Sequence, residues 1–174
     1  NEESLSQTDT DAVTLQVSYD INDSATLTYI FGDRDGFEDV TSEFDGTAAP
    51  YISINNLNWT EQSSHELRMN VSTDKADNVL GYYHWESEYS QDWVTADLWP
   101  HLAPALIPDL CGTDGSGCPL TGGFGQRIFQ SQKNKAEALF AQVDYRLTDQ
   151  VELSAGVRYT EEVKKFFAQE AVYV

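Results

Sequence analysis

The chain has 174 residues, with 29 acidic and 10 basic side chains and a formal net charge of -19. This excess of negative charge argues against a surface for nucleic acid or anionic lipid, since phosphates would be repelled. No run of 18 uncharged apolar residues occurs, which excludes a membrane-spanning helix. A membrane-spanning strand stays open, because its apolar residues alternate with polar ones.

The first periodic segments are residues 12–19 and 25–34, separated by a turn at residues 20–23. Apolar and polar side chains alternate in both, the pattern of a strand with two different faces. The pair therefore predicts a β-hairpin. The apolar row of this hairpin consists of Val13, Leu15, Val17, Tyr19, Ala25, Leu27, Tyr29 and Phe31.

Two further hairpins repeat this plan. Residues 64–72 and 78–88 form the second, and residues 136–147 and 151–162 form the third, whose return strand has the clearest alternation in the chain. The apolar row predicted for these strands includes Val79, Gly81, Tyr83, Trp85, Leu139, Ala141, Val143, Tyr145, Val151, Leu153, Ala155, Val157 and Tyr159.

The connections alternate between short turns and two long segments, residues 35–60 and 89–134. A compact soluble domain seldom carries structureless loops of that length. Outer-membrane barrels combine short periplasmic turns with long extracellular loops. The predicted fold class is therefore all-β: a segment of an antiparallel transmembrane β-barrel, with about six strands in three hairpins.

Aromatic residues near the strand ends support this interpretation. All of them fall on the predicted apolar row, where two girdles at the lipid interfaces would lie. The alternative is that they cap the core of a soluble β-sandwich. The expected lipid-facing girdle consists of Tyr19, Phe31, Trp85, Tyr145 and Tyr159.

Three stretches carry a family resemblance. Residues 138–162, ALFAQVDYRLTDQVELSAGVRYTEE, resemble the strand-turn-strand of TonB-dependent outer-membrane receptors, and SHELRM (64–69) and VLGYY (79–83) are similar to the same family. The resemblance implies a Gram-negative outer membrane, an N-terminal plug domain and an inner-membrane energy-coupling protein as partner. It also implies a barrel of roughly 22 strands. The chain, in which no plug or energy-coupling box is found, is then expected to be a fragment of about a quarter of the wall.

The function implied by the resemblance is energy-coupled uptake of a nutrient or metal chelate. Siderophore, cofactor and carbohydrate stay open as substrate classes. The alternatives are a passive outer-membrane porin and a soluble β-rich binding or adhesion module. Outer-membrane lipid or lipopolysaccharide, the remaining barrel and the plug are the other expected partners.

The polar rows of the strands would face the barrel lumen and form hydrogen-bonded and ionic networks with the plug or with each other. The expected lumen-facing residues are Glu66, Arg68, Glu86, Asp144, Glu152 and Arg158. The segment 98–110 is unusually apolar for a loop, so Trp93 and Trp99 are candidate contacts for a ligand or partner. Packing against adjacent loops is the competing interpretation.

The remaining reactive side chains form no recognisable catalytic or cofactor-binding motif, so no enzyme activity and no cofactor are predicted. Cys111 and Cys118 enclose a short flexible span and are expected to form a disulfide in an oxidising compartment. A zinc site is not expected, because no second cysteine pair or nearby His accompanies them. The three histidines lack metal-ligand spacing, and no phosphate loop or nucleophile elbow occurs. Two acidic runs, 33–39 and 113–117, lack the full spacing of a calcium loop, so a solvated loop is preferred over calcium.

Overall fold

The computed structural model describes residues 4–43, 53–96 and 125–173. These residues form six strands and no helix, in agreement with the predicted all-β class. Among them there is no helix long and apolar enough to cross a membrane. The strands are β1 (Leu5–Asn22), β2 (Ala25–Glu43), β3 (Ser53–Ser72), β4 (Ala76–Ala96), β5 (Gly125–Thr148) and β6 (Val151–Tyr173).

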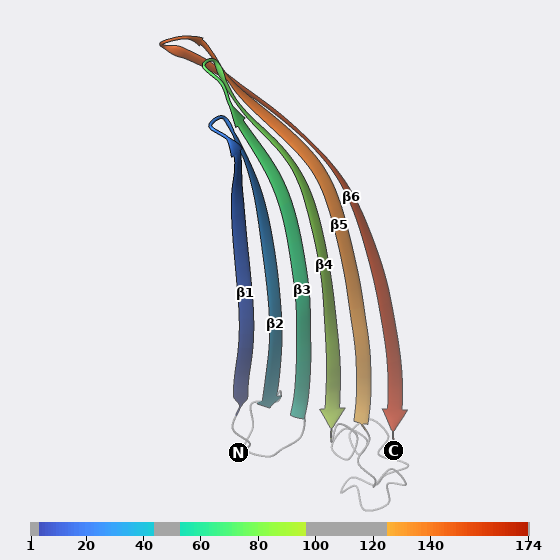
Figure 1. Ribbon diagram of the computed structural model, residues 1–174. Helices are drawn as coiled ribbons and strands as arrows, with labels where there is room; N and C mark the ends of the chain where they lie inside the picture. Colours follow the sequence, from blue (N-terminus) through green and yellow to red (C-terminus); the bar gives the residue numbers. More distant parts are fainter. Residues whose placement is uncertain (1–3, 44–52, 97–124, 174) are drawn as a thin grey trace, which may run out of the picture.

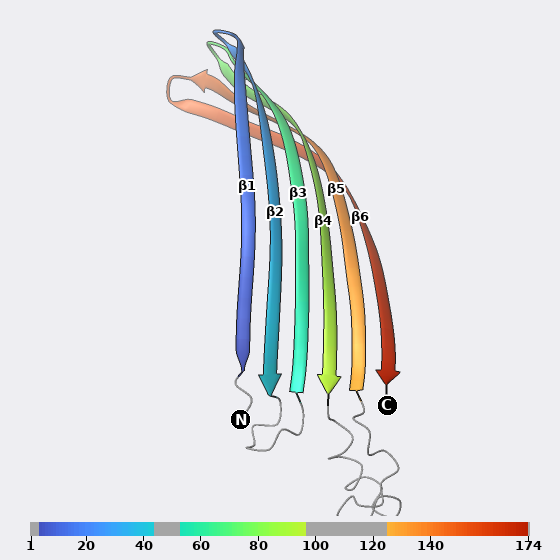
Figure 2. The same cartoon turned by 60° about the horizontal axis from the view of Figure 1, so that its bottom comes forward.

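The strands form one antiparallel sheet in chain order, β1-β2-β3-β4-β5-β6 (Figure 1). The three short turns lie together at one end of the sheet, here called the turn end, and the opposite end is called the loop end. The sheet is a single curved layer that twists along its length (Figure 2). It does not close on itself, because β1 and β6 lie at opposite edges and each pairs with one neighbour.

The strands extend further toward the loop end than the sequence predicts. Residues 35–43, 53–63, 89–96 and 125–135 continue the ladder, so much of the two expected long loops is strand. The sequence predicts strand boundaries where the apolar alternation stops. Backbone hydrogen bonds between neighbouring strands do not depend on that alternation, so the strands continue through segments with polar side chains.

The register defines two faces of the sheet, because cross-strand partners point to the same side. Face A is the side that carries Leu15, Leu67 and Leu139, and face B is the opposite side. One row on face A runs across all six strands and is apolar throughout. This row consists of Val17, Tyr29, Leu67, Tyr82, Leu139 and Tyr159.

The prediction for β4 is wrong: its predicted apolar row, Val79 to Trp85, lies on face B and not on face A. Leu80 pairs with Met69 and Ala141 on face A, so Trp85, five residues further on, lies on face B. The alternation could not decide the side, because both rows of this strand contain aromatic and aliphatic residues. Only the cross-strand pairing places them. Glu86 correspondingly lies on face A.

Face A leaves large apolar side chains uncovered. Leu80 is 60% exposed, and Val157 and Tyr159 are each 70% exposed. Ala138, at 2%, is the one buried hydrophobic residue in the described ranges. A soluble β-sandwich would cover such a face with a second layer, and residues 4–43, 53–96 and 125–173 supply none.

Candidate functional site on the two faces of the wall

The apolar side chains of face A form a continuous band near the turn end, here called the apolar band. On β5 it runs from Tyr145 to Leu139 and ends at Glu137. The members of the apolar band are Val13, Leu15, Val17, Tyr19, Leu27, Tyr29, Phe31, Leu67, Met69, Val71, Leu80, Tyr82, Leu139, Ala141, Val143, Tyr145, Leu153, Ala155, Val157 and Tyr159.

The border of the apolar band is oblique to the strand register. On β1 the band reaches Val13, which lies in the same row as Val163 of β6, whereas on β6 the band ends four residues earlier, at Tyr159. With ~3.3 Å per residue and ~4.8 Å between strands, this offset corresponds to a strand tilt of about 30°. Strands of transmembrane barrels are tilted by about 35–45°. A level lipid layer would therefore fit this band.

Four of the five expected girdle residues share face A: Tyr19, Phe31, Tyr145 and Tyr159. Tyr145 lies at the turn side of the apolar band and Tyr159 at its loop side. Trp85 is a correction, because it lies on face B. Contact of the other four with lipid stays a prediction.

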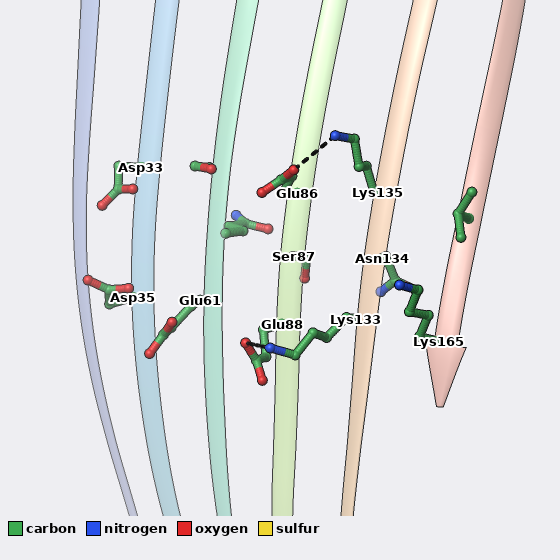
Figure 3. A pocket seen from close by; sticks show the side chains of 13 residues that line it. Asp33, Asp35, Glu61, Glu86, Ser87, Glu88, Lys133, Asn134, Lys135 and Lys165 are labelled. Atoms are coloured by element: carbon green, nitrogen blue, oxygen red, sulfur yellow. Dashed lines mark ion pairs between the residues drawn. The ribbon is translucent and has the colours of Figure 1, made fainter. Parts of the chain in front are cut away.

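A row of charges, here called the charged belt, borders the apolar band on face A toward the loop end. It surrounds a hollow of about 500 Å³. Carboxylates from β2, β3 and β4 occupy one side and lysines from β5 and β6 the other (Figure 3). The charged belt consists of Asp33, Asp35, Glu61, Glu86, Glu88, Lys133, Lys135 and Lys165.

Two ion pairs connect β4 and β5 within the charged belt. Lys133 Nζ lies 2.8 Å from Glu88 Oε2, and Lys135 Nζ lies 3.3 Å from Glu86 Oε1 (Figure 3). The hydrogen bond from Lys135 lowers the pKa of Glu86, and the bond to Glu88 raises the pKa of Lys133. Both pairs thus stay charged near neutral pH. Hydrocarbon chains would not cover such a surface, so the charged belt sets the loop-side limit of the apolar band.

His65, His84 and the acidic run 33–39 form no metal site, since no group of three or more potential ligands occurs within residues 4–43, 53–96 and 125–173. His65 Nδ1 is hydrogen-bonded to the Tyr29 hydroxyl at 2.8 Å, and His84 lies between two carboxylates. The acidic run 33–39 is part of β2 rather than a loop. Its Asp residues lie on face A and Glu38 lies on face B, so they do not converge.

Face B carries five of the six residues expected in a lumen. Arg68 donates from Nε to Glu66 Oε1 at 2.9 Å, and Asp144 accepts from Gln142 at 3.0 Å. These contacts join neighbours of one strand. Glu86 is a correction, since it belongs to the charged belt on face A. The residues on face B are Glu66, Arg68, Asp144, Glu152 and Arg158.

Gly81 makes room for an aromatic and cationic cluster on face B. A Cβ at Gly81 would lie 2.1 Å from Phe140 Cζ, so only glycine lets this ring lie against the backbone of β4. The Arg158 guanidinium carbon lies 5.5 Å from the centre of the Tyr83 ring and 5.7 Å from that of Phe140. These distances are those of cation–π contacts. The cluster connects side chains of the three neighbouring strands β4, β5 and β6.

Trp93 lies in β4 and on face B, not in a loop. Its side chain is 36% exposed, between Asn56 and Ile128 of the neighbouring strands. Among the expected loop residues, Trp99 lies outside the described residues, as do Cys111 and Cys118 and the acidic run 113–117. The structure therefore does not test their expected roles.

Near Trp93, the side chains of Tyr89, Asn58 and Glu38 form a hydrogen-bonded group on face B. The Tyr89 hydroxyl donates to Asn58 Oδ1 at 2.7 Å, and Asn58 Nδ2 donates to Glu38 Oε2 at 3.0 Å. Burial, assisted by the Glu38 carboxylate, raises the pKa of Tyr89, so this phenol stays a neutral donor. Sequence reasoning missed this group, although aromatic and amide residues at alternate positions of 85–93 were the available signal.

The fold resembles the solved structure of an uptake receptor. The ferric yersiniabactin uptake receptor FyuA from Yersinia pestis matches with a TM-score of 0.65 and 15% identity over 97% of this chain and 25% of FyuA. BauA, the ferric preacinetobactin receptor from Acinetobacter baumannii, matches with a TM-score of 0.45 and 11% identity over 96% of this chain and 27% of BauA. This chain thus spans about a quarter of each receptor's length. No match to a curated protein is found.

The sequence also matches a family as a whole. Residues 1–171 match the family described as "TonB dependent receptor-like, beta-barrel". The family consists of transport receptors rather than enzymes, and its members lie in the outer membrane of Gram-negative bacteria. A plug domain and TonB-coupled energy transduction belong to the family as well. The extent of this match, together with the open antiparallel wall, leads to one conclusion: the chain belongs to the β-barrel family of TonB-dependent receptors.

Proposed function

We propose that the chain is a sector of the barrel wall of an outer-membrane receptor, which takes up a nutrient or metal chelate with energy delivered from the inner membrane. The observation that carries this proposal is the division of one wall into an apolar band on face A and a polar face B, within a family match over residues 1–171. Lipid would cover the apolar band, and face B would line the lumen beside the plug.

The position of the charged belt indicates how deep the wall would lie in the membrane. It begins where the apolar band ends, so its carboxylates and lysines would lie at the level of the outer-leaflet head groups. Lysines suit the phosphates of lipopolysaccharide, whereas carboxylates need bridging divalent cations to approach them. The short turns would then be periplasmic, and the loop end would extend beyond the outer surface.

The open edges of the sheet support the participation of further strands. In lipid, unpaired backbone groups along β1 and β6 would each cost several kcal/mol. Neighbouring strands of the barrel would satisfy them. Iron chelates are the substrates to test first, because FyuA is described as an uptake receptor for ferric yersiniabactin.

The test is uptake by cells that carry the intact receptor, with and without a functional inner-membrane coupling protein. We expect uptake of a tested substrate to depend on both the receptor and the coupling protein. Uptake that depends on the receptor but continues without coupling would favour the passive porin. Secretion of the protein in soluble form would favour the binding or adhesion module and contradict the proposal.

A further inference from the structure

The loop-side part of face B lacks charge over three adjacent strands. On β3, β4 and β5, every face B position beyond the level of the apolar band carries an amide, hydroxyl, aromatic or aliphatic side chain. This surface, here called the neutral track, consists of Ile54, Asn56, Asn58, Thr60, Gln62, Ser64, Trp85, Ser87, Tyr89, Gln91, Trp93, Thr95, Gln126, Ile128, Gln130, Gln132, Asn134 and Ala136.

The absence of charge is specific to this surface. The chain as a whole has a net charge of -19, and face A of the same strands carries most of the charged belt. On face B the charges resume at both sides of the neutral track, with Arg34 and Glu38 on β2 and Glu162 and Lys164 on β6. A lumen that only needed water contact would tolerate charge on β3–β5 as well. The neutral track therefore fits an uncharged ligand.

The side chains of the neutral track are arranged in parallel rows. The central row, on β4, presents Trp85, Tyr89 and Trp93 at every fourth residue, which places successive rings about 13 Å apart along the strand. The rows on either side, on β3 and β5, supply the amides, and each lies about 4.8 Å from the central row. An aromatic face flanked by amides complements a ligand with flat apolar faces and hydroxyls at its edges.

Hydrogen-bonding capacity remains available on the neutral track. Gln130 donates to Gln91, which leaves the amide nitrogen of Gln91 and the amide oxygen of Gln130 without a partner in the described ranges. The buried Oδ1 of Asn56 has no partner there either. Such groups are expected to bond a ligand or water, because polar groups left unpaired cost free energy.

We propose that the neutral track is a binding surface for a neutral oligosaccharide, whose sugar rings stack on the aromatic row of β4 and whose hydroxyls bond the amides of β3 and β5. This inference rests on the proposed function and specifies its substrate class. The absence of charge disfavours an anionic chelate as the ligand of this sector, because no described side chain of the neutral track would neutralise it.

The test is binding of maltohexaose, cellohexaose and xylohexaose to the intact receptor in detergent, measured by calorimetry, with ferric citrate as an anionic comparison. We expect at least one hexasaccharide to bind with an affinity that changes little with salt. Trp93→Ala should weaken that binding at least tenfold, whereas Trp93→Phe should retain most of it. Trp59→Ala is the matched control, because Trp59 lies on face A of the adjacent strand and should leave binding unchanged.

Heat-modifiable migration on gels would verify that each variant forms a barrel. The proposal is overturned if no hexasaccharide binds, if Trp93→Ala binds like the unchanged protein, or if Trp59→Ala is equally damaging. Coupled uptake of ferric citrate that is unaffected by Trp93→Ala would overturn this inference while leaving the proposed function intact. Hexasaccharide binding without coupled uptake of any substrate would count against the proposed function alone.

Discussion

Replacing Leu80 by Arg tests which row of β4 faces lipid. Leu80 is 60% exposed on face A and pairs with Ala141, which lies four residues from Tyr145 and four from Glu137, the two limits of the apolar band on β5. At ~3.3 Å per residue and a tilt of about 35°, Leu80 lies about 11 Å from either border. It is therefore near the middle of a band about 25 Å tall.

An arginine at mid-bilayer depth on the lipid face costs about 2–4 kcal/mol. We expect Leu80→Arg to lower the free energy of unfolding of the intact receptor by that amount. The control is Val79→Arg, one residue earlier, whose side chain lies on face B between Asn70 and Gln142. An arginine there would remain in water, so the loss in free energy of unfolding should stay below about 1 kcal/mol.

The assay is urea titration of the intact receptor folded into phospholipid bilayers, together with its yield in outer-membrane fractions. Alternation in the sequence alone assigns Val79 to the lipid side, so it predicts the opposite ranking of these two variants. The reasoning from the register is refuted if Val79→Arg is the more costly change, or if Leu80→Arg unfolds at the same urea concentration as the unchanged protein.

Two further substitutions test contacts between strands. Gly81→Ala should displace the Phe140 ring, which would lie 2.1 Å from the new Cβ, and cost about 1–3 kcal/mol in urea titration; adding Phe140→Ala should recover part of that loss, and a purely additive double variant would contradict the account. Asp92→Ala removes an ion pair in which Asp92 is 10% exposed and Arg127 is 55% exposed, so we expect a loss of about 1 kcal/mol rather than the ~3–5 kcal/mol of a fully buried pair. A loss of ~3–5 kcal/mol in the same titration would show instead that this pair behaves as fully buried.

The hairpins could be predicted from the sequence because turn chemistry and alternation agreed. In β6, Leu153 and Val157 alternate with residues that are all polar or small, so only one side could be apolar. In β4 both rows contain large apolar residues, and alternation gives no direction. The side of Leu80 follows from its partners Met69 and Ala141, which are distant in sequence.

The loop-side half of the strands was not predictable for a related reason. Beyond the apolar band, neither face needs an apolar row, so the alternation that marks a strand disappears while the backbone ladder continues. The sequence pattern accordingly predicts a loop at Trp93, although Trp93 lies in β4. The candidate ligand surface depends on three strands in register, and a single strand's pattern cannot reveal it.

The direct test of the central claim, that face A lies in lipid and face B in water, is spin-label accessibility along β4 in the intact receptor. Single cysteines at residues 78–88, with Cys111 and Cys118 replaced by Ser, would be labelled and probed with oxygen and with a water-soluble nickel complex. We predict that oxygen reaches Leu80 and Tyr82, that nickel reaches the odd-numbered positions, and that both Glu86 and Glu88 are open to nickel. Oxygen access at the odd-numbered positions, or no alternation at all, would contradict the account.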